Sequence, residues 1–253
     1  MDLGLTGKRA IVTGGTRGIG RRIVELLVAE GCDVGFCARD ATEVAAMVRD
    51  LGGDGRRLIG DAVDVTDDAG LRQWIDATAQ ALGGLDILVP NASALASGAD
   101  EEAWRKGMDV DILGTVRCVE AAMPYLEASS AAAIVAIAST AAINTVGGVR
   151  AYSGVKAALV NYLSGLSTNL GAKGIRANTV SPGAIYFEGG VWDVRKREAP
   201  DAYAAAVARC PLGRLGTPEE VANAVVFLAS PAASFISGTN LIVDGAATTR
   251  IQF

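Results

Sequence analysis

Short apolar runs alternate with segments of helical periodicity along the whole chain. Apolar runs predict strands at about 8–13, 34–38, 57–65, 86–90, 133–138, 176–181 and 240–243. Between them, apolar residues spaced three or four apart predict helices at about 21–30, 42–51, 68–82, 101–127, 152–173 and 218–229. Strands that are apolar throughout are typical of a parallel sheet buried on both faces. We therefore predict an α/β fold, a doubly wound parallel sheet of about seven strands with helices on both faces, in a single domain over residues 1–253.

The composition describes a globular chain and excludes several kinds of site. Of 253 residues, 50% are hydrophobic and 20% are charged, and the net charge of −5 argues against nucleic-acid binding. No apolar run approaches the ~20 residues that span a bilayer, and residues 1–8 lack a signal-peptide core. We therefore expect a cytoplasmic protein without a membrane partner. Four cysteines without metal-ligand spacing predict free thiols and no metal site, and the absence of histidine excludes Ser-His-Asp hydrolysis.

One pair of polar side chains is spaced for proton transfer. Tyr152 and Lys156 are four residues apart on a predicted helix, so both project from one face, a turn apart. A phenol alone holds its proton tightly at neutral pH, and a fixed ammonium beside it favours the phenolate. Such a pair can act as acid and base on a hydroxyl or carbonyl group. Ser139 lies thirteen residues upstream, although Ser139 could also cap a turn and Tyr152 could be a packing aromatic.

A glycine-rich turn follows the first predicted strand and opens the first helix. Its sequence over residues 13–20 is Thr-Gly-Gly-Thr-Arg-Gly-Ile-Gly. Glycine allows a sharp turn close to a phosphate, and a helix N-terminus offers the phosphate free N–H groups. Any tight strand-to-helix loop can use glycine, but in the first βα unit this turn predicts a dinucleotide site. We expect the contacts to come from Gly14, Thr16, Arg17, Gly18, Ile19 and Gly20.

The end of the second predicted strand indicates which dinucleotide is bound. An acidic residue there would bind the ribose hydroxyls of NAD, whereas this chain has Arg39. Arg39, and Arg17 in the glycine turn, can both hydrogen-bond a 2′-phosphate. Asp40 could instead pair with Arg39 or bind the ribose, and the two arginines could also be solvated surface residues. We predict NADP(H) as the cofactor, with NAD(H) as the alternative.

Six motifs, in this order and spacing, resemble the short-chain dehydrogenase/reductase family from about residue 6 to residue 246. They are the glycine turn, Asp64-Val65, Pro90-Asn91-Ala92-Ser93, the trio Ser139, Tyr152 and Lys156, Ser181-Pro182-Gly183, and residues 237–245. The resemblance is to members similar to 3-oxoacyl-(acyl-carrier-protein) reductases, and it implies a Rossmann fold. It also implies cofactor contacts from Asp64, Val65, Asn91, Tyr152, Lys156, Pro182, Gly183 and Ile185.

The resemblance further implies the chemistry. The protein would be an oxidoreductase that interconverts a carbonyl and a secondary alcohol, both small molecules, by hydride transfer with NADP(H). Ser139 would hold the substrate oxygen, Tyr152 would donate or withdraw the proton, and Lys156 would favour the phenolate and hydrogen-bond the nicotinamide ribose. The alternative is an NADP(H)-binding scaffold or sensor of the same fold with little turnover.

Three positions depart from the family pattern. Asp111 stands where the family has a catalytic asparagine that helps to place a water leading from the lysine. A carboxylate in a buried helix needs a partner, and Lys156, through that water, is the candidate. Ser93 replaces a glycine, and its β-carbon could crowd the cofactor. The threonine that the family commonly places soon after Gly183 is missing, so Tyr186 or backbone groups would have to substitute for it.

Residues 186–210 fall where the family has its mobile substrate loop. Tyr186, Phe187 and Trp192 predict an apolar wall there. The basic run 195–197 could attract an acidic substrate, although charge runs are usually solvated helix faces. The resemblance implies a homo-oligomer, a tetramer or a dimer, assembled through the long helices predicted at 101–127 and 152–173.

Overall fold

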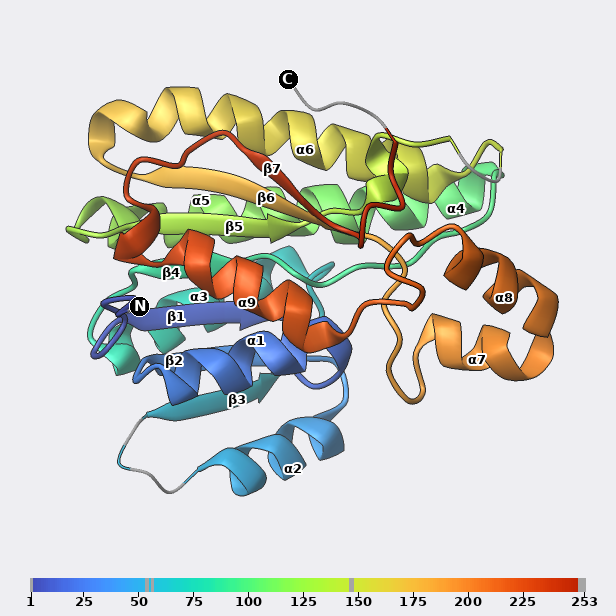
Figure 1. Cartoon of the computed structure of the whole chain (residues 1–253). Helices are drawn as coiled ribbons and strands as arrows, with labels where there is room; N and C mark the ends of the chain where they lie inside the picture. Colours follow the sequence, from blue (N-terminus) through green and yellow to red (C-terminus); the bar gives the residue numbers. More distant parts are fainter. Residues whose placement is uncertain (1, 53–54, 56, 146–147, 250–253) are drawn as a thin grey trace.

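Parallel strands form the centre of the molecule, and their carboxyl ends lie along one side of it (Figure 1). The computed structural model describes residues 2–52, 55, 57–145 and 148–249. Within them, seven strands form one parallel sheet in the order β3-β2-β1-β4-β5-β6-β7. The strands are β1 (Arg9–Thr13), β2 (Asp33–Ala38), β3 (Leu58–Ala62), β4 (Ile87–Val89), β5 (Ala133–Ile137), β6 (Arg176–Pro182) and β7 (Asn240–Val243). The predicted doubly wound sheet is confirmed, and its order reverses between β1 and β4, where such sheets form a ligand crevice.

Helices cover both faces of the sheet and bury two apolar layers. α1 (Gly18–Ala29), α2 (Ala41–Leu51) and α9 (Pro218–Ala229) lie on one face, with α1 packed along α9. α3 (Asp68–Leu82), α5 (Gly114–Glu127) and α6 (Ala151–Leu170) lie on the other face. Neighbouring strand residues point to opposite layers, so Val12 reaches the first layer and Ile11 the second. Burial of both faces explains why the strands are apolar throughout.

The segment predicted as one helix over 101–127 consists of three helical pieces. α4 (Glu101–Gly107) leads into a π-helical turn, η1 (Met108–Leu113), and η1 leads into α5. Such turns are rare within α-helices and are frequent at functional sites. Asp111 in η1 is buried, whereas Leu113 is exposed. The helix predicted over 152–173 likewise ends in a 3-10 turn, η3 (Gly171–Lys173).

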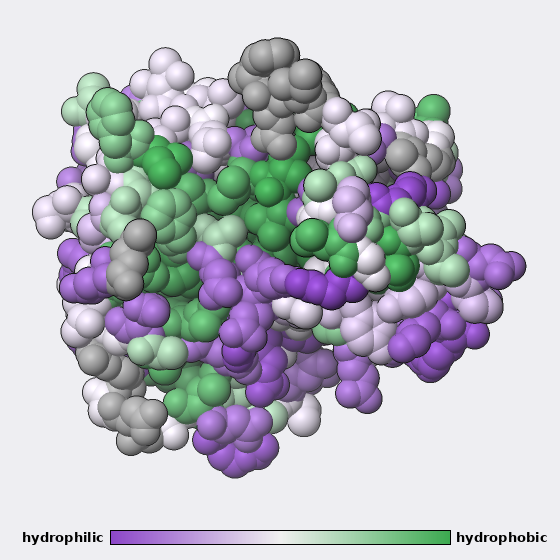
Figure 2. Space-filling view, viewed as in Figure 1, coloured by the Kyte–Doolittle hydropathy of each residue, from purple (hydrophilic) through white to green (hydrophobic). Residues whose placement is uncertain are grey.

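The segment predicted as a substrate loop, 186–210, contains two short helices, α7 (Val191–Glu198) and α8 (Pro200–Ala208). They project beyond the carboxyl ends of the strands, and their surface carries both hydrophilic and apolar residues (Figures 1 and 2). No residue of α7 is buried, so its sequence has no apolar stripe that predicts a helix. Lys196 lies over the rings of Tyr186 and Tyr203, with Nζ 5.3 and 5.8 Å from their centroids. In the described part of the chain, no helix is both long and apolar enough to cross a membrane.

Candidate active site

The predicted site residues follow the carboxyl ends of the strands. The glycine turn follows β1, Arg39 follows β2, Asn91 follows β4 and Ser139 follows β5. Because parallel strands end at the same edge, these residues lie along the edge where doubly wound sheets form a ligand crevice. After β6, the N–H of Gly183 donates to the carbonyl of Val243. A Cβ on Gly183 would lie 2.6 Å from the Cβ of Asp244, so this turn requires glycine.

The glycine turn leaves a helix N-terminus open for a phosphate. Arg17 is the N-cap of α1 and provides no side-chain cap for the first N–H groups of the helix. A Cβ on Gly20 would lie 2.0 Å from the carbonyl oxygen of Gly14, so the close approach of these two segments requires glycine. Thr16 is buried and donates its hydroxyl to Glu43 at 2.7 Å. An uncapped helix start beside a glycine turn fits the pyrophosphate of a dinucleotide.

Asn91 fastens the segment after β4 to this turn. Its side-chain amide donates to the carbonyl oxygens of Thr13 and Gly14, both at 2.9 Å. In return, Thr13 Oγ1 accepts the N–H groups of Asn91 and Ala92 at 3.0 and 3.1 Å. Thr13 is a site residue that the sequence interpretation missed. Its position at the start of the glycine motif was the signal that could have found it.

Two exposed arginines follow β1 and β2, at the positions predicted to bind a 2′-phosphate. Arg17 and Arg39 are exposed, and neither forms an ion pair with another described residue. Asp40 does not pair with Arg39, because its carboxylate caps α2 and accepts two N–H groups of the first turn at 2.8 and 3.1 Å. Asp64, after β3, accepts the N–H and hydroxyl of Thr66 at 2.9 and 2.8 Å. These hydrogen bonds, together with nearby Arg39, hold the pKa of Asp64 below its usual value.

Three further predicted contact residues are apolar and largely buried. Val65 is 8% exposed and lies against Gly114, where a Cβ would be 3.2 Å from its side chain. Ile19 packs on the first apolar layer. Ile185 belongs to the same layer and forms a β-bridge with Gly216. These three side chains therefore pack in the apolar layers beneath the predicted cofactor site.

The predicted catalytic trio lies just after β5 and on α6. Ser139 follows β5 and begins a 3-10 turn, η2 (Thr140–Ala142), where its Oγ accepts the N–H of Ala141 at 3.1 Å. It therefore does cap a turn, but this bond uses a lone pair and leaves the hydroxyl hydrogen available to a substrate oxygen. Tyr152 and Lys156 lie one turn apart on α6, with Nζ 5.8 Å from the centroid of the tyrosine ring. Nζ also donates to the carbonyl of Ile137 at 2.8 Å, which ties α6 to β5.

Asp111 contacts the lysine directly. Its Oδ1 lies 2.9 Å from Lys156 Nζ, and the two side chains are 1% and 2% exposed. Lys156, the partner predicted for the buried carboxylate, is therefore its partner in the structure. The predicted contact through a water is replaced by a direct ion pair. The other carboxylate oxygen accepts the N–H of Ala94 at 2.9 Å, a contact that the sequence did not predict.

The segment after Asn91 lies along the start of α6. Ala96 and Gly98 accept N–H groups from the first turn of α6 at 3.0 and 2.9 Å. Ser93, the second departure from the family pattern, accepts the N–H of Leu95 at 3.2 Å through its hydroxyl. Leu95 has a left-handed backbone (φ 49°) and is 48% exposed. A strained, exposed apolar residue that directly precedes the carbonyl bound by the N–H of Tyr152 is a candidate wall for a substrate.

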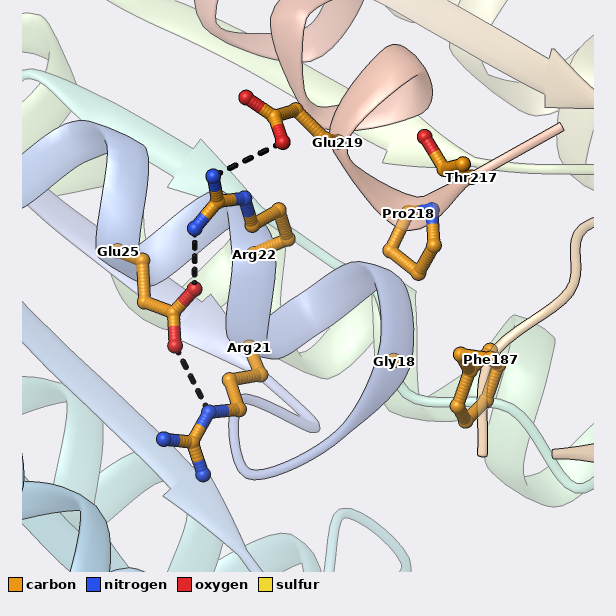
Figure 3. A pocket seen from close by; sticks show the side chains of 8 residues that line it. All are labelled: Gly18, Arg21, Arg22, Glu25, Phe187, Thr217, Pro218 and Glu219. Atoms are coloured by element: carbon orange, nitrogen blue, oxygen red, sulfur yellow. Dashed lines mark hydrogen bonds and ion pairs between the residues drawn. The ribbon is translucent and has the colours of Figure 1, made fainter. Parts of the chain in front are cut away.

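An aromatic ring covers the outer side of the glycine turn (Figure 3). A cleft of about 290 Å³ lies between this turn, the start of α9 and Phe187. The ring is so close that a Cβ on Gly18 would lie 2.6 Å from it. Phe187 was predicted for a substrate wall, and its contact with the cofactor turn was not predicted. The polar lining is already paired, because Arg22 binds Glu25 and Glu219 at 2.8 and 2.9 Å.

All four cysteines are buried, and two of them are held as neutral thiols. All four are free, which confirms the prediction from their spacing. Burial raises the pKa of Cys118 to about 12 and raises that of Cys37 even further above its usual value. Both thiols therefore stay protonated at neutral pH.

Comparisons with known proteins agree with these features. A family model described as enoyl-(acyl carrier protein) reductase matches residues 14–248. Isoepoxydon dehydrogenase of Penicillium expansum is 39% identical, with 100% of this chain and 99% of the relative covered. A 3-oxoacyl-(acyl-carrier-protein) reductase of Vibrio harveyi is 33% identical over 96% of this chain and 98% of the relative. The structure of L-sorbose reductase from Gluconobacter frateurii, complexed with NADPH and L-sorbose, matches with a TM-score of 0.90 and 29% identity, covering 99% and 100% of the two chains.

Proposed function

Because the chain belongs to the short-chain dehydrogenase/reductase family and is an oxidoreductase, we propose that it interconverts a carbonyl and a secondary alcohol by hydride transfer with NADP(H), with Tyr152 as general acid and base. The observation that carries this proposal is the placement of Tyr152 and Lys156 one turn apart on α6, a helix that packs against the η2 turn capped by Ser139. The relatives are named as dehydrogenases and reductases, which supports an enzyme over a cofactor-binding scaffold.

Each residue of the trio has a distinct task in this reaction. The nicotinamide supplies or accepts the hydride when it is bound. In reduction, the hydroxyl of Ser139 donates a hydrogen bond to the carbonyl oxygen, where negative charge develops. Tyr152 donates its proton to that oxygen, and in oxidation it withdraws the proton from the alcohol. Lys156, fixed by Ile137, holds a positive charge beside the tyrosine.

The cofactor preference rests on the two unpaired arginines. Arg39 and Arg17 are exposed beside the crevice, and Asp40, which would favour ribose hydroxyls, is occupied in capping α2. NADPH is the dinucleotide in the L-sorbose reductase structure. We infer that both guanidinium groups bind the 2′-phosphate, which NAD(H) lacks.

Arg39→Ala is expected to weaken NADPH binding about tenfold and to leave NADH binding nearly unchanged. The reason is the loss of a charge-assisted hydrogen bond to the 2′-phosphate. Fluorescence titration with each nucleotide measures the two affinities. Arg49→Ala removes an arginine from the exposed surface of α2 and serves as the matched control. Equal losses for NADPH and NADH would contradict the assignment.

The substrate is proposed as a small ketone, and a panel of carbonyl compounds tests that class. The relatives are named for different substrates, so the family alone does not identify this one. We propose that residues 186–210 form the substrate loop and that the exposed side chain of Leu95 forms part of the substrate wall. NADPH consumption with cyclic ketones, keto sugars and 3-oxoacyl thioesters should single out one class. No consumption with any of them, in either direction, would favour the scaffold.

A homo-oligomer, dimer or tetramer, is proposed through the α4–η1 surface. Trp104, Met108 and Leu113 are 36%, 40% and 43% exposed there. Exposed apolar side chains on one helical segment suit the same surface of a second copy. Leu113→Glu is expected to reduce the molar mass measured by light scattering at least twofold, because it would place a charge in that interface. A wild-type protein that is a monomer would contradict the proposal.

A further inference from the structure

The Asp111–Lys156 ion pair changes the charge that Tyr152 experiences. Lys156 Nζ is the cation nearest to the tyrosine ring in the described contacts, and Asp111 Oδ1 lies 2.9 Å from it. Oδ1 has no aligned hydrogen-bond donor among the described residues. The negative charge on Oδ1 is therefore balanced by the positive charge of Lys156. With asparagine at this position, the lysine would be an unpaired cation.

Asp111 is held so that it cannot turn away from the lysine. Ala94 N–H binds Oδ2, and the hydroxyl of Thr115 donates to the Asp111 carbonyl at 2.7 Å. Both bonds fix the residue within the π-helical turn η1, where an irregular backbone is often retained for a functional reason. Both side chains are almost fully buried, so bulk solvent screens the attraction between the two charges very little. The ion pair is thus a fixed part of the site.

Other ionisable groups around α6 do not replace this pair. The elements β5 and η2 and residues 93–98 carry no ionisable side chain. Arg150, the N-cap of α6, is half-buried and has partners of its own. The remaining described groups on the elements packed against α6 are exposed or bound elsewhere: Glu101 with Arg105, Glu102, Lys106, Asp109 with Arg117, Glu120 with Arg72, Lys173 with Glu127, and Arg176 with carbonyls at and after the end of α9.

We propose that Asp111 is a positioning residue that reduces the net charge with which Lys156 acts on Tyr152. This inference rests on the proposed role of Tyr152 as the general acid and base. An unpaired ammonium strongly favours a phenolate, whereas an ion pair presents little net charge. The pair therefore favours the phenolate of Tyr152 less than an unpaired lysine would. Compared with an unpaired lysine, it favours proton donation in carbonyl reduction and disfavours proton withdrawal in alcohol oxidation.

The test is the pH dependence of kcat/KM in both directions for the wild type and Asp111→Asn. In the variant, the alkaline fall of reduction and the alkaline rise of oxidation should both move about one pH unit lower, because one group controls both. Asp109→Asn is the matched control: it makes the same change two residues away, in the same turn, at a carboxylate paired with Arg117. A purely structural effect would lower kcat/KM without changing the pH at which reduction falls and oxidation rises.

The inference can be tested even if the protein does not catalyse the proposed reaction. If the alkaline fall of reduction and the alkaline rise of oxidation stay at the same pH in Asp111→Asn, or move to higher pH, the inference is overturned and the proposed function is left intact. If no carbonyl or alcohol is turned over, ultraviolet titration of the Tyr152 phenolate, obtained by subtracting the matching Tyr152→Phe spectra, replaces the kinetics. The phenolate should then appear at lower pH in Asp111→Asn than in the wild type. Appearance at the same pH would overturn the inference.

Discussion

Replacing Tyr152 with phenylalanine is expected to lower kcat about 10²–10⁴-fold and to leave NADPH binding within about twofold of the wild type. The substitution removes one oxygen atom, so the ring can keep its place on α6 beside Lys156. What is lost is the proton that neutralises the developing alkoxide in reduction. The measurement is steady-state turnover together with a nucleotide titration.

The matched control is Tyr162→Phe on the same helix. Tyr162 is half-buried, and burial raises the pKa of its phenol, so it stays protonated and has no part in the proposed chemistry. The control should retain wild-type turnover. A Tyr152→Phe enzyme that keeps most of its activity would show that another group transfers the proton.

The largest expected loss of stability comes from Asp86, at the opposite edge of the sheet. Its carboxylate accepts the N–H, Nε and Nη2 of Arg9 at 2.9, 2.8 and 2.9 Å, and the hydroxyl of Ser129 at 2.6 Å. The side chain is 4% exposed and joins β1 to the segments that lead into β4 and β5. Asp86→Ala leaves Arg9 without its partner and should cost about 3 kcal/mol of unfolding free energy. Glu101→Ala, which breaks an exposed pair with Arg105, should cost under about 0.5 kcal/mol.

The cost of Asp86→Ala should depend on pH. Burial alone would raise the pKa of Asp86, but hydrogen bonds from Arg9 and Ser129 outweigh it, so the pKa lies below its usual value. A carboxyl with a lowered pKa stabilises the fold fully above its unfolded pKa, near ~4, and the stabilisation is lost as the pH falls through the folded pKa. Denaturant unfolding should therefore show the full difference at pH 7 and a narrowing difference below about pH 4. A constant difference across this range would contradict the assignment.

The sequence predicted those elements whose ends carry local signals. α9 begins where expected because Thr217 and Glu220 form a capping box around Pro218, and α3 ends where Gly83 adopts a left-handed conformation. α7 could not be predicted, because a helix without a buried face leaves no apolar period. The π-helical turn has no local signal either, since its buried Asp111 depends on Lys156 and Ala94, which lie elsewhere in the chain.

In the site too, features with a local sequence pattern were predicted, whereas contacts between distant segments were not. The glycine turn and the Ser139, Tyr152 and Lys156 spacing are local patterns, and their elements place them at one edge of the sheet. The ring of Phe187 on Gly18 joins segments far apart in the sequence, so only the fold brings it to the cofactor turn. Asp111 was identified as unusual from its position, but whether it reaches the lysine directly or through water depends on side-chain packing that no sequence period encodes.

Transfer of deuterium from NADPH, labelled at the hydride-donating carbon, tests the central claim most directly. The protein is incubated with labelled NADPH and the best ketone of the panel, and the product is examined by mass spectrometry and NMR. The proposed function predicts one deuterium on the carbinol carbon of the alcohol, with loss of the transfer in Tyr152→Phe. Binding of NADPH without transfer of label to any carbonyl compound, and without reduction of NADP by any alcohol, would contradict it.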